Sequence, residues 1–392
     1  MSQSKFKAAS LLAGTALVAL GVSVAGQANA GSHARVVKNT ADQVSLRLSG
    51  MIARKVVMQD DGDSARFRHT DSNYSSSRIR FHPSARINKD IRVVGTIETA
   101  IDDARNGGGG AAQFAGRSGN DLQTRVAEIS FRHAALGNLT IGSGNKAANG
   151  VMNTNTHGVY AALPSGAAFL NSGAVFKDSE TGAGDTGPSL GAAFGDFDFT
   201  SRGSRLRYDS PNYNGFVVSA SHDDETAVEF ALRYSGRFAG SRVRASAGYS
   251  DSLTSNADNA QIYGGLMSFT HSSGFGATGG CQYENEDQND DTNTNHEDPF
   301  GCTTQVHLAR KFNDLGLTTM VFEWEHQTNL AANGDTANSY GFTVQQNIDA
   351  ASVQVFAKYA TFDLERDATN TSGNKIEFQD INMFAVGTRI RF

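Results

Sequence analysis

The chain has 392 residues with 42 Gly, 5 Pro, 2 Cys and 39% hydrophobic residues, which excludes collagen-like and disulfide-dense scaffolds. Its 34 basic and 40 acidic side chains give a formal net charge of −6, so it lacks the basic excess expected of a nucleic-acid partner. Single packed cores stop growing at roughly 250–300 residues, so a chain of this length either divides into domains or encloses a hollow barrel.

The first 30 residues have the pattern of a secretory signal peptide. Lys5 and Lys7 precede an apolar stretch at 8–25, and Ala28-Asn29-Ala30 supplies the small residues of a cleavage site. A membrane-anchoring helix is the alternative, but polar residues interrupt the apolar run and the cleavage site follows directly. We expect residues 1–30 to be removed on export. Later segments lack ~18 consecutive apolar residues, so any membrane crossing by the mature chain, 31–392, must use strands.

From about residue 43 onward, apolar and polar residues alternate in segments of about ten residues, as transmembrane strands do. Arg78 and Arg80 share one strand face, while Ile79 and Phe81 share the other. The same period continues to Phe392 at the C-terminus. A soluble β-sandwich also alternates, so the period alone does not separate the two architectures.

The lengths of the connections favour the barrel. Short turns are predicted at 88–90, 136–138, 209–215, 236–241, 272–274, 313–314 and 347–349. Longer polar connections, with a brief exception at 222–226, are predicted at 59–73, 103–121, 143–203, 251–260, 284–301, 327–339 and 365–380. Alternating short and long loops are typical of outer-membrane barrels, so the sequence predicts an all-β, antiparallel transmembrane barrel of about 16 strands. Pro83 falls mid-strand and predicts a bulge or a register break.

Several segments, in matching order and spacing, resemble the general bacterial porins, a trimeric sixteen-stranded Gram-negative family, and especially their alphaproteobacterial branch. The segments are SRIRF at 77–81 with GTIE at 95–98, LGNLTIG at 136–142, RYDSP at 207–211 with GF at 215–216, and the terminal Phe392. Together they cover most of the mature chain.

The resemblance implies a cell outer-membrane channel for passive diffusion of small hydrophilic solutes and ions. It also implies a homotrimer surrounded by lipid and lipopolysaccharide, whose Phe392 is read as an assembly signal by the barrel insertion machinery. The third long loop, 143–203, would fold inward and narrow the pore. Acidic side chains of that loop are candidates to face the lumen: Asp178, Glu180, Asp196 and Asp198.

Basic side chains concentrate on the early strands, on faces shared with other polar residues. The expected pore-lining set is Arg47, Arg78, Arg80, Arg86, Arg92, Arg132, Arg205 and Arg207. An arginine facing lipid at mid-depth would cost ~2–4 kcal/mol, which favours inward placement. Such a wall opposite an acidic loop would create a transverse field in the pore. The alternative is that several of these arginines lie at the rim and bind lipid phosphate.

Cys281 and Cys302 flank the acidic connection at 284–301, and in an exported chain we expect a disulfide between them rather than two free thiols. The connection itself is predicted to be a solvated outer loop, because its acidic spacing does not match a calcium loop. Two cysteines are too few for a convincing zinc site. The sequence therefore predicts no bound metal and no cofactor.

Two other functions compete with passive diffusion. A substrate-selective channel on the same barrel would need a binding site in the pore, for which Tyr160, Phe169, Phe194 and Phe197 are the candidate aromatic residues. A barrel enzyme would need an activated nucleophile, and Ser, Asp and Glu residues near His are too common in this composition to indicate a catalytic set. We therefore expect a channel without catalytic residues.

Overall fold

The computed structural model places most of the mature chain. It describes residues 36–38, 44–71, 75–102, 121–162, 166–179, 187–195, 197, 199, 201–223, 227–252, 260–286, 297–369 and 375–392. The predicted signal peptide, 1–30, lies outside these residues. Within them, no helix combines the length and the apolar character needed to span a membrane.

Nearly all of the described chain forms strands of one sheet. In chain order they are β1 (Val36–Lys38), β2 (Val44–Asp60), β3 (Ala65–Thr70), β4 (Arg78–Arg86), β5 (Ile91–Asp102), β6 (Asp121–His133), β7 (Gly137–Asn145), β8 (Arg202–Asp209), β9 (Phe216–Asp223), β10 (Ala227–Phe238), β11 (Ser241–Ser252), β12 (Ala260–His271), β13 (Phe275–Glu286), β14 (Phe300–Asn313), β15 (Gly316–Thr328), β16 (Asp335–Ile348), β17 (Val353–Thr369), β18 (Lys375–Glu377) and β19 (Ile381–Arg391).

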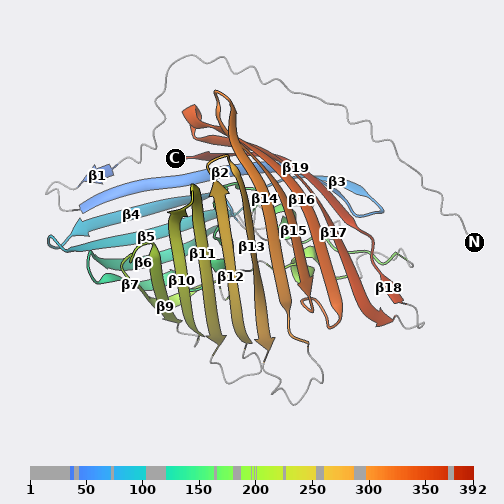
Figure 1. The fold of residues 1–392 in the computed structure, drawn as a ribbon, viewed down its shortest axis with the longest axis horizontal. Coiled ribbons are helices and arrows are strands. Elements are labelled where there is room, and N and C mark those ends of the chain that lie inside the picture. Colours follow the sequence, from blue (N-terminus) through green and yellow to red (C-terminus); the bar gives the residue numbers. More distant parts are fainter. Residues whose placement is uncertain are drawn as a thin grey trace, which may run out of the picture.

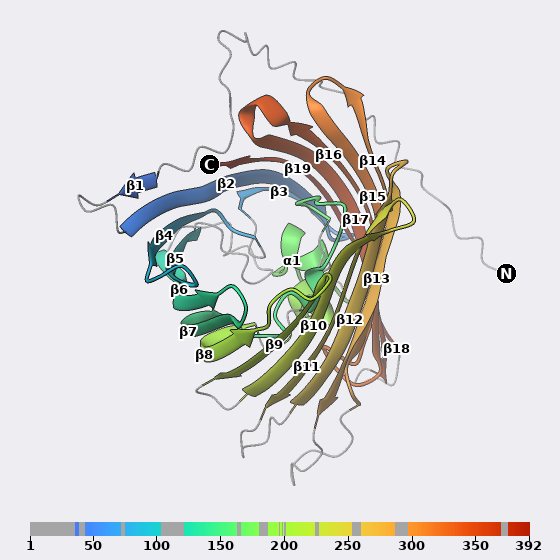
Figure 2. The same ribbon diagram turned by 60° about the vertical axis from the view of Figure 1, so that its left-hand side comes forward.

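The sheet closes on itself. Apart from the short strands β1, β3 and β18, each strand pairs antiparallel with the one before it, and β19 pairs with β2. The seam ends where the main chains of Phe392 and Gly50 exchange two hydrogen bonds of 2.8 and 3.1 Å. The predicted sixteen-stranded antiparallel barrel is therefore confirmed, and Figures 1 and 2 show its wall and its opening. Closure removes sheet edges, whose unpaired backbone groups lipid could not satisfy.

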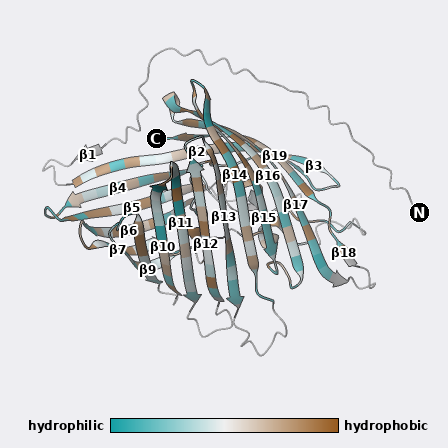
Figure 3. Cartoon of the chain, in the orientation of Figure 1, coloured by the Kyte–Doolittle hydropathy of each residue, from teal (hydrophilic) through white to brown (hydrophobic). Residues whose placement is uncertain are grey.

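The two faces of the wall differ as the sequence period predicts. Phe81 and Ile97 point outward and are 40% and 48% exposed, whereas their inward neighbours Arg78 and Glu98 are 8% and 5% exposed. Figure 3 shows the resulting alternation of hydrophobic and hydrophilic residues along the strands. The lipid-facing surface of the barrel is apolar because every second residue of each strand is apolar. A strand can therefore cross the membrane without a continuous run of apolar residues.

Pro83 interrupts pairing without shifting it. On β5, Phe81 pairs with Ile97 and Ser84 with Val94, so the register is the same on both sides of the unpaired His82 and Pro83. The proline cannot donate to the ladder. The facing position is Gly95, where a Cβ would lie 2.9 Å from the Pro83 ring. The predicted bulge or register break is not found, and the irregularity is limited to two positions without a partner on β5.

The connection between β7 and β8 lies inside the barrel. β7 extends to Asn145 and β8 begins at Arg202, so this loop spans 146–201 and is shorter at both ends than the predicted 143–203. It carries the short helices η2 (Val151–Asn153), α1 (Gly166–Leu170) and α2 (Leu190–Ala193). Figure 2 shows α1 within the ring of strands. We call residues 146–201 the constriction loop.

Candidate functional site

The inner wall of β4 to β8 carries a concentration of arginines around a polar cavity of about 350 Å³. Alternation along the strands directs these side chains inward, opposite to the apolar residues between them. The charged residues lining the cavity are Arg78, Arg80, Glu98, Arg125, Glu128, Arg132, Arg202, Arg205, Arg207 and Asp209. Carboxylates are outnumbered on this wall.

Glu98 on β5 lies at the centre of a group of arginines on this wall. Its carboxylate accepts from Arg78 at 3.3 Å, from Arg125 at 2.9 Å, and from Arg80. Arg125 reaches it from a bulge in β6 opposite Glu98 and Thr99. Because three guanidinium groups share one carboxylate, the cluster has two excess positive charges. We call these four residues the Glu98 cluster.

The members of the Glu98 cluster differ in their access to the lumen. The Arg80 side chain is 35% exposed, whereas that of Arg78 is 9% exposed. Arg78 donates to the Ser76 carbonyl at 2.8 Å and to Glu98, and its Nη2 is buried without a hydrogen-bond partner in the described structure. Arg80 is therefore the member best placed to meet a solute.

Arg205 and Arg207 on β8 each have a carboxylate partner. Arg205 pairs with Glu128 and is only 4% exposed. Arg207 forms an ion pair of 2.7 Å with Asp209, which lies two residues farther along the same strand. Both also donate to main-chain carbonyls near the start of the constriction loop. Their charges are locally balanced, so they contribute less to the field in the pore than the Glu98 cluster.

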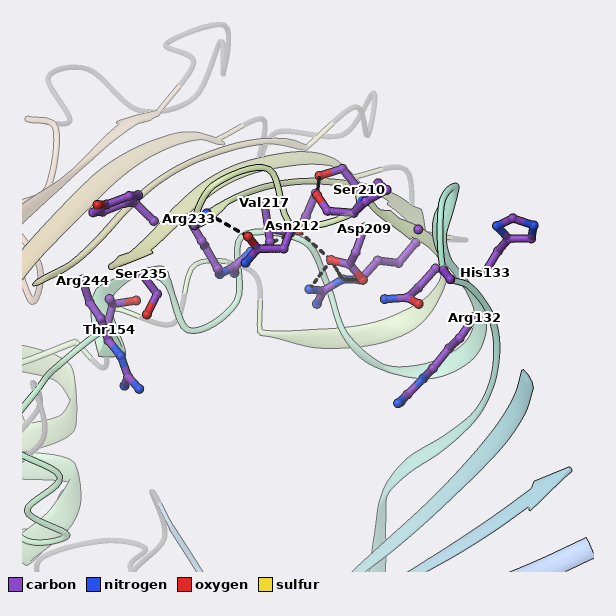
Figure 4. Close-up of a pocket in the computed structure, with 18 of the residues that line it drawn as sticks. Arg132, His133, Thr154, Asp209, Ser210, Asn212, Val217, Arg233, Ser235 and Arg244 are labelled. Carbon is purple, nitrogen blue, oxygen red and sulfur yellow. Dashed lines mark hydrogen bonds and ion pairs between the residues drawn. The ribbon is translucent and has the colours of Figure 1, made fainter. Parts of the chain in front are cut away.

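A larger cavity of about 1070 Å³ continues from the same wall to β10 and β11. Its basic lining residues are Arg92, Arg132, Arg207, Arg233 and Arg244. In Figure 4, Arg132 stands on one side of this space and Arg233 and Arg244 on the other. Arg92 also donates to Ser84 at 2.9 Å. This part of the lumen therefore offers several cationic side chains to the same body of water.

Six of the eight predicted pore arginines line these two cavities: Arg78, Arg80, Arg92, Arg132, Arg205 and Arg207. The other two, Arg47 and Arg86, lie on the inward faces of β2 and β4, where Arg47 is paired with His82 and Arg86 with Arg92. The structure thus brings the predicted set to one inner wall.

The sequence predicts that four acidic residues of the constriction loop face the lumen, and the structure describes one of them, Asp178. Glu180, Asp196 and Asp198 lie outside the described residues. The main chain of Asp178 bridges to Phe378, next to β18. Its neighbour Lys177 forms ion pairs with Asp61 at 3.3 Å and with Asp63 at 3.1 Å, beyond the end of β2. This part of the loop is fastened to the connections at the barrel end.

The contact with Lys177 affects the pKa of Asp61. Burial would raise the pKa of Asp61, but the main-chain N–H of Ser64 and the ammonium of Lys177 donate to its carboxylate and lower the pKa below its usual value. Asp61 therefore stays ionised, and the ion pair that fastens the loop persists at neutral pH.

The middle of the constriction loop packs against the opposite wall, formed by β2, β16, β17 and β19. Phe169 and Leu170 of α1 are completely buried there, among wall residues that include Phe356 and Met383. Phe169 makes edge-to-face contacts with Tyr160 and Phe356 at centroid distances of 5.2 and 5.6 Å. Apolar residues of the loop and of this wall thus form a shared hydrophobic core.

This packing removes the aromatic residues proposed for a selective binding site. Tyr160, Phe169, Phe194 and Phe197 are at most 4% exposed, so their rings face the wall and not the lumen. Two wall lysines fix the main chain beside them: Lys358 donates to the Ala161 carbonyl at 2.9 Å, and Lys55 donates to the Phe169 carbonyl. Lys358 also pairs with Glu323.

His157 anchors the loop farther along, against β14. Its Nδ1 accepts from the Val159 N–H at 3.1 Å, so Nε2 carries the proton and donates to Gln305 at 2.9 Å. The His307 ring lies 5.3 Å away, edge to face. Burial lowers the pKa of His157 to about 4, since hydration of the charged imidazolium is lost. The imidazole is therefore neutral at physiological pH.

Cys281 and Cys302 form a disulfide. They are directly paired residues of β13 and β14, at the base of the acidic connection. Both occupy outward positions of their strands, so the bond lies on the outer surface of the barrel and not in the lumen. Among the described residues, no group of three or more His, Cys, Asp or Glu is arranged to hold a metal ion.

Sequence reasoning missed several residues of the site. Glu98, Glu128 and Asp209 share the inward parity of the predicted arginines, as do Arg233, Arg242 and Arg244, so alternation could have found them. Arg125 could not have been found this way, because the bulge in β6 changes the parity at that point.

A family model described as Gram-negative porin matches residues 13–368 of the chain. A search of curated protein sequences finds no significant match to this chain.

Solved structures share the fold at low sequence identity. An anion-selective porin from Comamonas acidovorans is 12% identical, with a TM-score of 0.60 over 89% of this chain and 100% of that one. OmpT of Vibrio cholerae in its trimer form is 15% identical, with a TM-score of 0.56 over 90% and 100% of the two chains. OmpF of Salmonella typhi in complex with daunomycin is 18% identical, with a TM-score of 0.53 over 91% and 100%.

Proposed function

The chain belongs to the Gram-negative porins, which form channels in the outer membrane, and we propose that its pore conducts small hydrophilic anions in preference to cations. The single observation that carries this preference is the Glu98 cluster, where three guanidinium groups share one carboxylate on the lumen wall. Passage is by diffusion through water, without a covalent step or a cofactor.

Arg80 contributes most to the preference. A unit charge acts on an ion 4 Å away with about 1 kcal/mol even in bulk water, and low-dielectric walls strengthen the interaction. The partly exposed Arg80 is the guanidinium of the cluster that an ion can approach to this distance. The anion-selective porin from Comamonas acidovorans has the same fold, which is consistent with this role.

The constriction loop limits the size of the solute. It fills the side of the lumen next to β2 and β16 to β19 and leaves the water-filled space beside the arginines. A binding site for one substrate would need rings or ligands directed into that space, and the loop aromatics are buried instead. A general diffusion channel is therefore favoured over the substrate-selective alternative.

We further propose a homotrimer in contact with lipid and lipopolysaccharide, in which Phe392 acts as the assembly signal for the insertion machinery. Support for the trimer comes from the trimer form of Vibrio cholerae OmpT, which has the same fold. Support for Phe392 comes from its position at the closing seam, where it pairs with Gly50. Cross-linking of detergent-extracted protein tests the trimer, and surface yield of a Phe392→Ala variant tests the signal.

Planar-bilayer recording in a salt gradient tests the anion preference. The wild-type reversal potential should indicate anion selectivity, and Arg80→Gln should lower the anion-to-cation permeability ratio by on the order of fivefold at low salt, as loss of about 1 kcal/mol requires. Arg54→Gln is the matched control, because Arg54 is on the outward face of β2 and its loss changes the net charge equally. An unchanged reversal potential for Arg80→Gln contradicts the proposal.

A further inference from the structure

The first part of the constriction loop, residues 146–157, crosses the inside of β8 to β14 without joining the sheet. We call it the entry segment. Its peptide groups lack the ladder bonds that satisfy strand backbone, so each buried N–H and C=O needs another partner. The wall supplies these partners with side chains, and most of those that meet carbonyl groups are arginines.

The contacts follow the segment around the wall. Arg207 donates to the Lys146 carbonyl at 3.0 Å, and Arg233 donates from one nitrogen to the carbonyls of Ala147 at 2.7 Å and Asn149 at 3.0 Å. Farther along, the Asn155 and Thr156 carbonyls accept from Arg244 at 3.0 Å and from Arg242 at 3.1 Å. Three successive parts of the segment are thus held by β8, β10 and β11.

Shorter wall side chains bind the main-chain N–H groups between these points. Glu229 accepts from Ala148 at 2.6 Å and is completely buried. Ser221 accepts from Ala147 at 2.8 Å, and Ser268 accepts from Thr156 at 2.9 Å. Both the N–H groups and the carbonyl groups of the segment therefore have wall partners, and arginines supply most of the donors to the carbonyl groups.

We infer that Arg233, Arg242 and Arg244 are positioning residues that set the width of the pore by holding the entry segment, and are not primarily the source of its charge selectivity. The inference deepens the proposed function, since it assumes that the constriction loop narrows a conducting pore. A guanidinium presents five N–H donors in a rigid plane, so one side chain reaches two carbonyls and a neighbouring wall group. Arg233 does this by donating to Ser219 as well, at 3.3 Å.

Replacement by lysine separates position from charge. Arg233→Lys keeps the positive charge but has a single nitrogen in place of the planar fork. The lysine variant should lose the two carbonyl contacts that Arg233 makes. Each hydrogen bond contributes modestly to the free energy of docking, but the two act together. The fraction of molecules with a detached entry segment should therefore rise roughly tenfold. We expect more open-channel current noise and an altered conductance at an unchanged reversal potential.

Arg54→Lys is the matched control, because Arg54 lies on the outward face of β2, away from the lumen and the entry segment. It should leave noise and conductance near wild type. Arg242→Lys provides a second, milder test, since Arg242 is solvent-exposed and its one loop contact is to Thr156.

A spin label at Thr154→Cys reports on the segment directly, and the native cysteines do not compete because they are bonded to each other. The label should become more mobile in Arg233→Lys and remain unchanged in Arg54→Lys. Wild-type noise and label mobility in Arg233→Lys, together with a shift of reversal potential in Arg233→Gln equal to that in Arg80→Gln, would overturn the inference. That result would leave the anion preference intact, whereas failure of Arg80→Gln alone would refute the preference and not the positioning role.

Discussion

The two sides of the lumen are built from the same alternating strands and have opposite characters. On β4 to β8 the inward residues are arginines and carboxylates bordering water-filled cavities. On β2 and β16 to β19 the inward residues include Met51, Val57, Phe356 and Met383, covered by the constriction loop. The comparison teaches that inward-facing positions of a barrel need not be polar, because a loop folded into the lumen can supply a hydrophobic core of its own.

Cationic residues on the two sides also act differently. On the open side Arg80 retains exposed surface and net positive charge around it. On the covered side Lys55 and Lys358 are 4% and 0% exposed and donate to loop carbonyls. The cations of the open side therefore border the lumen, whereas those of the covered side hold the constriction loop against the wall.

The sharpest way to break this distinction is to empty the core of the covered side. Phe169→Ala should weaken docking of the loop by about 3–5 kcal/mol, because the ring is fully buried between loop and wall. Single-channel conductance should increase while circular dichroism still shows the barrel. Phe216→Ala, which removes a half-exposed outward ring, is the control and should leave conductance unchanged. Equal conductance in both variants would mean that the loop does not depend on this core.

A second test removes a buried cation from the same side. Lys358→Met leaves the Glu323 carboxylate buried without its partner, which should cost about 3–5 kcal/mol. Adding Glu323→Gln should restore much of this loss, because the stranded charge is then gone. Thermal unfolding in detergent, combined with conductance, measures both variants. If the double variant is no more stable than the single one, the cost does not come from the unpaired carboxylate.

The third and smallest effect concerns pH. Burial lowers the pKa of His157 to about 4, compared with about 6.5 for an exposed histidine. Docking of the loop is therefore most stable above pH 6.5. It should lose on the order of 3 kcal/mol of docking free energy as the pH falls toward 4. Label mobility at Thr154→Cys should rise over this range. His157→Gln should remove most of the dependence, while His307 and Arg242, which lie nearby, remain. A mobility that is flat from pH 7 to 4 in the wild type contradicts the expectation.

The barrel could be predicted from sequence because each strand repeats the same two-residue period and the turns are short at one end. That argument needs no knowledge of long-range packing, and it placed Arg78, Arg80 and Phe81 on the correct faces. It gave loop boundaries only approximately, since strands β7 and β8 run beyond the residues where the alternation becomes weak.

The site could be predicted less completely. Parity indicates which arginines face inward, but it does not indicate which carboxylate or carbonyl each one meets. Arg205 borders the cavity as expected, but most of its surface is buried against Glu128 and main-chain carbonyls of β7. The loop aromatics show the same limit, because whether Phe169 faces water or wall depends on how an irregular segment folds within a closed space.

The disulfide between Cys281 and Cys302 has a consequence for biogenesis. β13 includes Gly276, Gly279 and Gly280, which have no side chains to specify the pairing register between β13 and β14. A disulfide between two directly paired residues fixes the register of the whole hairpin. Oxidation during export would therefore deliver this hairpin to the membrane already aligned, before the remaining strands have found their neighbours.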